Sequence, residues 1–185
     1  MYKPFDELTR RSFEHATADM GSPIQEASLD RVMQAYNGLD SFEEIPEAIQ
    51  KLKETPGFQS YIFSNGTSAM VTQSVATSKG LSSMGYFTPE KVITVNDVKV
   101  YKPEPRAYKY LIERLGETDE KKVWLVSSNP FDVCGAAAVG VSTAWIDRAG
   151  KGWVDGLGKA FDLEPTVICS DVSSAVDEIK SRTGN

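Results

Sequence analysis

Three short polar clusters in this sequence contain residue types that bind and activate small anions. They are Ser64-Asn65-Gly66, Tyr101-Lys102-Pro103 and Ser127-Ser128-Asn129-Pro130-Phe131-Asp132. Serine and asparagine side chains donate hydrogen bonds, and a lysine ammonium supplies positive charge. Asp132 can act as a general base, or Lys102 as a general acid. The clusters therefore predict a site for a small carboxylate or another small anionic molecule.

Each cluster also has a purely structural interpretation. Ser64-Asn65-Gly66 can be an ordinary turn from a strand to a helix. Asn129 can cap a second helix, with Pro130 at its first position and Asp132 in its first turn. A lysine beside a proline is usually a solvated surface charge. The three clusters together, each after a strand or before a helix, favour a functional site.

Five short runs rich in β-branched and aromatic residues predict strands. They cover residues 58–63, 91–95, 123–126, 142–146 and 166–169. Helical patterns separate most of them, and the clearest spans residues 105–115 and ends at Gly116. Strands that alternate with helices pair in parallel through crossover connections. We therefore predict an α/β fold with a parallel sheet in a Rossmann-like three-layer α/β/α core, whose ligands bind beyond the carboxyl ends of the strands.

The first third of the chain is predicted to be helical. Two amphipathic patterns, each ended by a glycine, precede a third helix with Pro46 in its first turn. Residues 147–163, rich in glycine and lysine, are expected to form a surface loop. We place the boundary between a helical segment, residues 1–45, and an α/β core, residues 46–185.

Composition narrows the classes of function. The net charge of -6 and the pI near 4.9 argue against a nucleic-acid partner. One histidine, His15, leaves little for a His-rich metal site or a Ser-His-Asp triad. Cys134 and Cys169 lie in apolar runs and are expected to be buried free thiols. Because no apolar stretch approaches the ~20 residues that span a bilayer, we expect a cytoplasmic protein without a membrane partner.

In this α/β pattern the three clusters resemble the motifs of the haloacid dehalogenase superfamily, and most closely its L-2-haloacid dehalogenase branch. The resemblance covers nearly the whole chain and implies a hydrolase whose helical cap corresponds to residues 1–45. Ser64-Asn65-Gly66 is similar to the family's second motif, which contacts the substrate carboxylate and the leaving halide. Lys102 matches the third-motif lysine, which steadies the negative charge of the nucleophile.

The resemblance also assigns the remaining site residues. Relatives that are phosphatases would carry aspartate at Asn129 to hold magnesium, so the resemblance implies a metal-independent site without a cofactor. Tyr108 falls where the family places an active-site tyrosine, and Phe131 stands in place of a tryptophan that forms an apolar wall. The implied catalytic residues are Lys102, Asp132, Ser127 and Asn129, and the implied substrate-binding residues are Ser64, Asn65, Tyr108 and Phe131.

The family's first motif is the main departure. That motif is an apolar strand that ends in the nucleophilic aspartate, followed by a glycine-threonine turn, and this chain shows no counterpart. Asp6 with Thr9 does not replace it, because the threonine is one residue too close and Pro4 interrupts any strand. The cap arginine that clamps the substrate carboxylate also has no counterpart. We therefore expect no covalent intermediate by the family's route and no haloacid hydrolysis.

The same departure affects the sheet. In the family, the nucleophile strand lies between the strands that end at Ser64 and Ser127. Without it, either those two strands pair directly or another segment, such as one from a second subunit, fills the slot. Because exposed strand edges favour association, we expect a homodimer.

Three functions remain open at this point. The chain can be part of a dehalogenase-like hydrolase whose nucleophile segment lies outside this sequence. It can be an enzyme repurposed for a lyase or isomerase step on a small carbonyl or carboxylate compound, using Lys102 and Asp132. It can also be a non-catalytic binding or dimerising protein.

Overall fold

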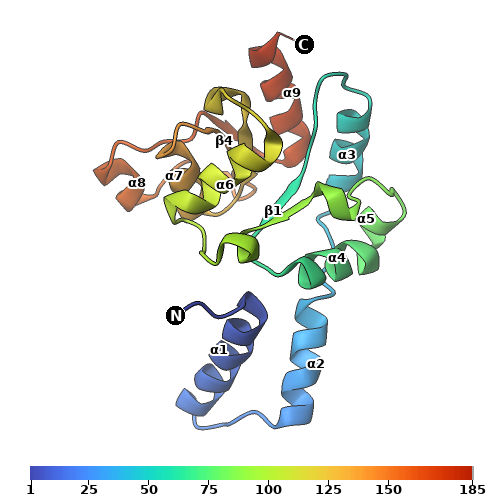
Figure 1. Ribbon diagram of the computed structural model, residues 1–185, viewed down its shortest axis with the longest axis vertical. Coiled ribbons are helices and arrows are strands. Elements are labelled where there is room, and N and C mark those ends of the chain that lie inside the picture. The colour runs from blue at the N-terminus through green and yellow to red at the C-terminus, as the bar shows by residue number, and fades with distance from the viewer. Residues whose placement is uncertain (185) are drawn as a thin grey trace. The chain divides into compact units, whose positions relative to one another are not determined.

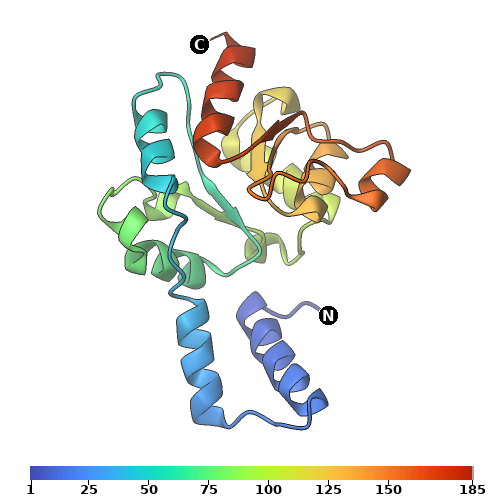
Figure 2. The ribbon, with the colours of Figure 1, turned by 180° about the vertical axis from the view of Figure 1, so that it is seen from behind.

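The structure is a computed structural model that describes residues 1–184, which form two compact units (Figures 1 and 2). The first unit comprises Met1–Phe42 and Tyr61–Lys99, and the second comprises Glu43–Ser60 and the described residues from Val100 on. This division differs from the predicted boundary between residues 45 and 46. In this division the N-terminal helices share a unit with the first two strands, and the boundary between a helical segment and an α/β core stays a prediction.

The first unit joins a helical pair to a small parallel sheet. Its elements are α1 (Phe5–Asp19), α2 (Glu26–Tyr36), β1 (Ile62–Ser64), α4 (Ser68–Thr77), α5 (Lys79–Ser82), the 3-10 helices η1 (Pro89–Lys91) and η2 (Val95–Val98), and β2 (Val92–Thr94). Helices α1 and α2 lie side by side, and Arg10 on α1 donates hydrogen bonds to Asp30, at 2.8 Å, and to Glu26 on α2. Strands β1 and β2 are parallel, with Phe63 opposite Ile93, and α4 packs against β2.

The second unit is a parallel sheet with helices on its faces. Its elements are α3 (Ile45–Lys53), α6 (Pro105–Leu115), the 3-10 helix η3 (Glu120–Lys122), β3 (Trp124–Ser127), α7 (Pro130–Ala137), β4 (Ser142–Ile146), α8 (Gly156–Ala160), β5 (Val167–Cys169) and α9 (Val172–Thr183). The strand order is β3-β4-β5, with Val126 opposite Ala144 and Ala144 opposite Val167. Helix α7 packs on β3 and β4, whereas α9 packs on β4 and β5 and against α3.

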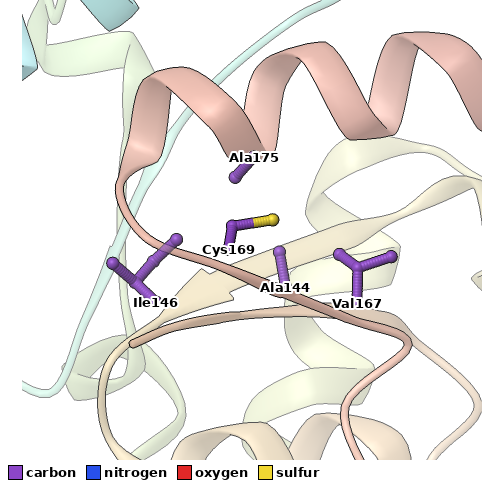
Figure 3. Packing of buried hydrophobic residues seen from close by; sticks show 5 residues of the cluster. All are labelled: Ala144, Ile146, Val167, Cys169 and Ala175. Atoms are coloured by element: carbon purple, nitrogen blue, oxygen red, sulfur yellow. The ribbon is translucent and has the colours of Figure 1, made fainter. Parts of the chain in front are cut away.

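The face of β4 and β5 under α9 carries a compact apolar core. Figure 3 shows its members, which are Ala144, Ile146, Val167, Cys169 and Ala175. Ala144 and Ala175 are fully buried, and their small side chains let the helix approach the sheet closely. Burial of apolar surface stabilises such a layer by roughly 25 cal/mol per Å². This core fixes the sheet whose strand ends lead into the candidate site.

The predicted elements can be compared with the observed ones. The strand Ser142–Ile146 and the helix Pro105–Leu115 have the predicted bounds. Strands β2 and β5 lie within their predicted runs, whereas β1 and β3 each end one residue later than predicted. The surface loop predicted over residues 147–163 is partly wrong, because it contains the short helix α8. The Asp155 side chain caps that helix by accepting a hydrogen bond from the Gly158 backbone. In residues 1–184, no helix is both long and apolar enough to cross a membrane.

Strands β1 and β3 each have one edge without a strand partner. In residues 1–184, β1 pairs with β2 alone and β3 pairs with β4 alone. The five strands therefore form two parallel sheets, and direct pairing of β1 with β3, one of the two arrangements considered above, is not among the observed pairings.

The unpaired edge of β3 leads to a prediction about assembly. Val126 on this strand is 38% exposed, so an apolar side chain accompanies the open edge. Open edges template association with another chain, and we expect the 20.3 kDa protein to form a homodimer. Sedimentation velocity at low micromolar concentration should show a species of twice the monomer mass. A well-folded monomer under those conditions would contradict the expectation.

Candidate active site

Lys102, Tyr108 and Asp132 form a buried hydrogen-bonded cluster in the second unit. The Lys102 Nζ lies 2.8 Å from Oδ2 of Asp132, and the Tyr108 hydroxyl donates to Oδ1 of the same carboxylate, also at 2.8 Å. The side chains of Lys102 and Asp132 are 9% and 5% exposed, and Tyr108 is fully buried. Two donors therefore hold the two oxygens of one carboxylate and fix its orientation.

Two helices bring this cluster together. Helix α6 starts at Pro105, after Glu104 accepts a hydrogen bond from the Arg106 backbone, so Lys102 lies just before the helix and Tyr108 lies on its buried face. Helix α7 starts at Pro130 and carries Asp132 in its first turn, where the helix dipole favours a carboxylate. Because α6 packs against α7, the lysine and the carboxylate meet between them.

Burial and charge affect the ionisation of the tyrosine. Burial raises the pKa of the Tyr108 phenol above its ordinary value of 10.0, and the negative charge of Asp132 and its hydrogen bond raise it further. A neutral phenol is a hydrogen-bond donor, whereas a phenolate would repel the adjacent carboxylate. Tyr108 therefore acts as a donor to Asp132 throughout the physiological pH range.

This shift predicts how stability depends on alkaline pH. Because the pKa of Tyr108 is higher in the folded state than in the unfolded state, its contribution is complete below about pH 10 and is lost as the pH rises toward the folded-state pKa. We expect Tyr108→Phe to lose less stability than the wild type between about pH 9 and pH 11, as measured by urea unfolding. Tyr36→Phe is a suitable control, since Tyr36 packs against Phe13 in the other unit. Equal pH profiles for wild type and Tyr108→Phe would contradict the assignment.

Ser127, Asn129 and Phe131 lie at the carboxyl end of β3, as predicted. The Ser127 hydroxyl oxygen accepts a hydrogen bond from the Asn129 backbone N–H at 3.1 Å. Asn129 occupies the N-cap position of α7, but its side chain makes no capping hydrogen bond and the residue is exposed. The capped-helix interpretation therefore does not account for the Asn129 amide. Phe131 is 46% exposed and presents an apolar surface in the first turn of the helix.

Ser64 and Asn65 lie in the first unit, at the carboxyl end of β1. The Ser64 hydroxyl oxygen accepts from the Gly66 backbone N–H at 3.0 Å, which is the same turn that Ser127 makes at the end of β3. Thr67 then caps α4 by accepting from the Met70 backbone at 3.3 Å. Convergence of Ser64 and Asn65 with the Lys102 cluster stays a prediction.

The structure also draws attention to a residue that the motifs do not mark. Gly135 on α7 lies directly under the ring of Tyr108. It belongs to the run Gly135-Ala136-Ala137, which in the sequence indicates only a tightly packed helix. A glycine three residues after a functional aspartate on a helix is the one signal that could have pointed to it, because such residues share a helix face.

Comparison with known proteins shows the family to which this fold belongs. A sequence model of the haloacid dehalogenase-like hydrolase family matches residues 4–140. The chain is 32% identical to the (S)-2-haloacid dehalogenase 4A of Burkholderia cepacia over 81% of its own length and 62% of that protein. It is 33% identical to the haloacetate dehalogenase H-2 of Moraxella sp. (strain B) over 90% of its own length and 71% of that protein.

The fold is likewise similar to solved structures. An L-2-haloacid dehalogenase structure superposes with a TM-score of 0.84 at 28% identity, covering 97% of this chain and 74% of the other. The L-2-haloacid dehalogenase of Xanthobacter autotrophicus gives a TM-score of 0.78 at 26% identity, covering 99% and 77%. The chain therefore belongs to the haloacid dehalogenase-like hydrolase family. It matches 62% of the length of the Burkholderia relative, less than two thirds.

Proposed function

We propose that the Lys102–Asp132–Tyr108 cluster is the charged centre of a site for a small carboxylate of the 2-haloacid type. The observation that carries the proposal is the buried Asp132 carboxylate, held by an ammonium on one oxygen and a phenol on the other. An ammonium in a buried setting interacts strongly with a second anion, because the low dielectric weakens screening. The names of the similar proteins, which are haloacid and haloacetate dehalogenases, support this substrate class.

The neighbouring residues complete the proposed chemistry. Lys102 supplies positive charge to the substrate, while Ser127 and Asn129 supply hydrogen bonds at the end of β3. Asp132 is held in a fixed orientation by Lys102 and Tyr108, and its ion pair in turn holds the Lys102 ammonium in place. Phe131 provides the apolar surface against which the carbon chain of the substrate packs.

Ligand binding tests this proposal directly. Calorimetric titration with (S)-2-chloropropionate and with propionamide compares an anion with a neutral molecule of similar size. We expect the carboxylate to bind with a dissociation constant on the order of 1 mM, and propionamide to bind at least tenfold more weakly. Asn129→Ala should weaken carboxylate binding, whereas Ser128→Ala, an exposed neighbour without an assigned role, should not. Equal binding of the two ligands would contradict the proposal.

A further inference from the structure

The ring of Tyr108 packs directly against the backbone of α7 at Gly135. A Cβ atom built on Gly135 would lie 2.5 Å from the Tyr108 hydroxyl oxygen, 2.6 Å from ring carbon Cε2 and 2.8 Å from Cζ. Non-bonded carbon atoms pack at about 3.5–4.0 Å, so any side chain at position 135 requires the ring to move. Both residues are buried, and close-packed interiors leave little room for such a movement.

The backbone does not explain this glycine. Gly135 is not among the residues with positive φ and lies inside a helix, where glycine is less stable than alanine. Many other glycines in the chain, such as Gly116, end elements with positive φ, which is the usual reason for glycine. At Gly135 the requirement is steric, and the atoms that impose it belong to Tyr108.

The same tyrosine ring contacts two positions on one face of α7. Its hydroxyl donates to Oδ1 of Asp132 at 2.8 Å and lies 3.2 Å from the Asp132 backbone carbonyl oxygen, while its edge lies on Gly135. Asp132 and Gly135 are three residues apart, so they are neighbours along the helix surface. The distance between the Tyr108 ring and the helix at Gly135 therefore determines the position of the Tyr108 hydroxyl relative to the Asp132 carboxylate.

We propose that Gly135 is a positioning residue for the Asp132 carboxylate and acts through the ring of Tyr108. Because Gly135 has no side chain, the Tyr108 ring packs directly against the helix. The Tyr108 hydroxyl then donates a hydrogen bond to Oδ1 of Asp132, and Oδ2 faces Lys102. This inference rests on the proposed function of the cluster for its biological meaning, but the geometry of the contact is independent of any ligand. The motifs of the sequence assign no role to Gly135.

Nuclear magnetic resonance of protein labelled with [ζ-¹³C]tyrosine tests the contact in the full 185-residue chain. The Tyr108 signal is assigned by its loss in Tyr108→Phe. In the wild type we expect this signal not to titrate up to about pH 11, because Asp132 and burial disfavour the phenolate, with a smaller contribution from Cys134. In Gly135→Ala the signal should shift and should titrate closer to the ordinary value near ~10.

Gly156→Ala is the matched control. Gly156 also lies in a helix without positive φ, and a Cβ atom there would meet nothing within 4 Å. This substitution should leave the Tyr108 signal and its titration unchanged. A Gly135→Ala protein that is folded and keeps the wild-type Tyr108 signal and titration would overturn the inference, whatever the result of the ligand titrations.

A second pair of variants keeps the test decisive if Gly135→Ala fails to fold. Leucine lacks the atoms of Tyr108 that approach position 135. In the Tyr108→Leu background, Gly135→Ala should therefore leave the denaturation midpoint equal or higher, while carboxylate binding stays at the low level of Tyr108→Leu alone. If Gly135→Ala lowers the midpoint equally with and without the tyrosine ring, the glycine acts through other atoms and the inference is wrong.

Discussion

Replacing Lys102 by methionine is expected to lower the free energy of unfolding by about 3–5 kcal/mol near neutral pH. The Asp132 carboxylate is 5% exposed and loses its ionic partner at 2.8 Å, while methionine fills most of the volume of the lysine stem. The buried charge then keeps only the hydrogen bond from Tyr108 among the interactions described above. The expected cost is that of an unpaired buried charge and exceeds the value of a surface ion pair, about 0–1 kcal/mol.

Urea unfolding of Lys102→Met beside the wild type measures this difference. Lys109→Met is the matched control, because Lys109 is exposed on the same helix and its loss should change stability by less than about 0.5 kcal/mol. A deficit below 1 kcal/mol would mean that the pair contributes little.

The 185-residue polypeptide is expected to bind (S)-2-chloropropionate without releasing chloride. The family's route needs an aspartate at the end of an apolar strand to displace the halide, and the sequence shows no such motif. Asp132 has both oxygens hydrogen-bonded, which makes the carboxylate a poor nucleophile. Loss of a nucleophile costs several powers of ten in rate, so chloride release should stay near the background of the uncatalysed reaction.

Chloride release measured over hours with micromolar protein checks this expectation. A rate near ~10 per second, typical of enzymes, would show that another residue attacks the substrate. In that event Asp132→Asn is the informative variant, because it removes the carboxylate while keeping its size. Activity that survives Asp132→Asn would exclude Asp132 as the attacking group.

The parts of the fold with strong local patterns were predictable from sequence. Helix α6 has apolar residues at helical spacing, a proline at its start and Gly116 at its end, so its bounds follow from the pattern. Strand β4 is predicted with its observed bounds because residues 142–146 are rich in β-branched and aromatic residues. Helix α8 was missed because a five-residue helix lacks an apolar stripe and depends on one capping contact from Asp155. Which strands pair was not predictable, because strand pairing depends on partners that are distant in sequence and that no local pattern reveals.

The candidate site was predictable in part. The types and order of Lys102 and Asp132 suggested a shared site, and the structure places them in one ion pair. The partner of Tyr108 was not predictable, because its place on the apolar face of α6 indicates burial but not that its hydroxyl bonds Asp132. The role of Gly135 could not be inferred from the sequence. A steric requirement appears there only as a small residue, and the sequence does not show which atoms impose it.

The two serine turns have a consequence for the kind of ligand they favour. A hydroxyl group has one proton to donate and two lone pairs. At the end of β1 and again at the end of β3, a backbone N–H already occupies a lone pair of the serine oxygen. The serine proton is directed away from that amide, and the bound N–H withdraws electron density from the oxygen and makes the proton a better donor. Each turn therefore leaves the serine hydroxyl better suited to donate a hydrogen bond to a ligand, and we expect both strand ends to favour an anion over a cation even without the lysine.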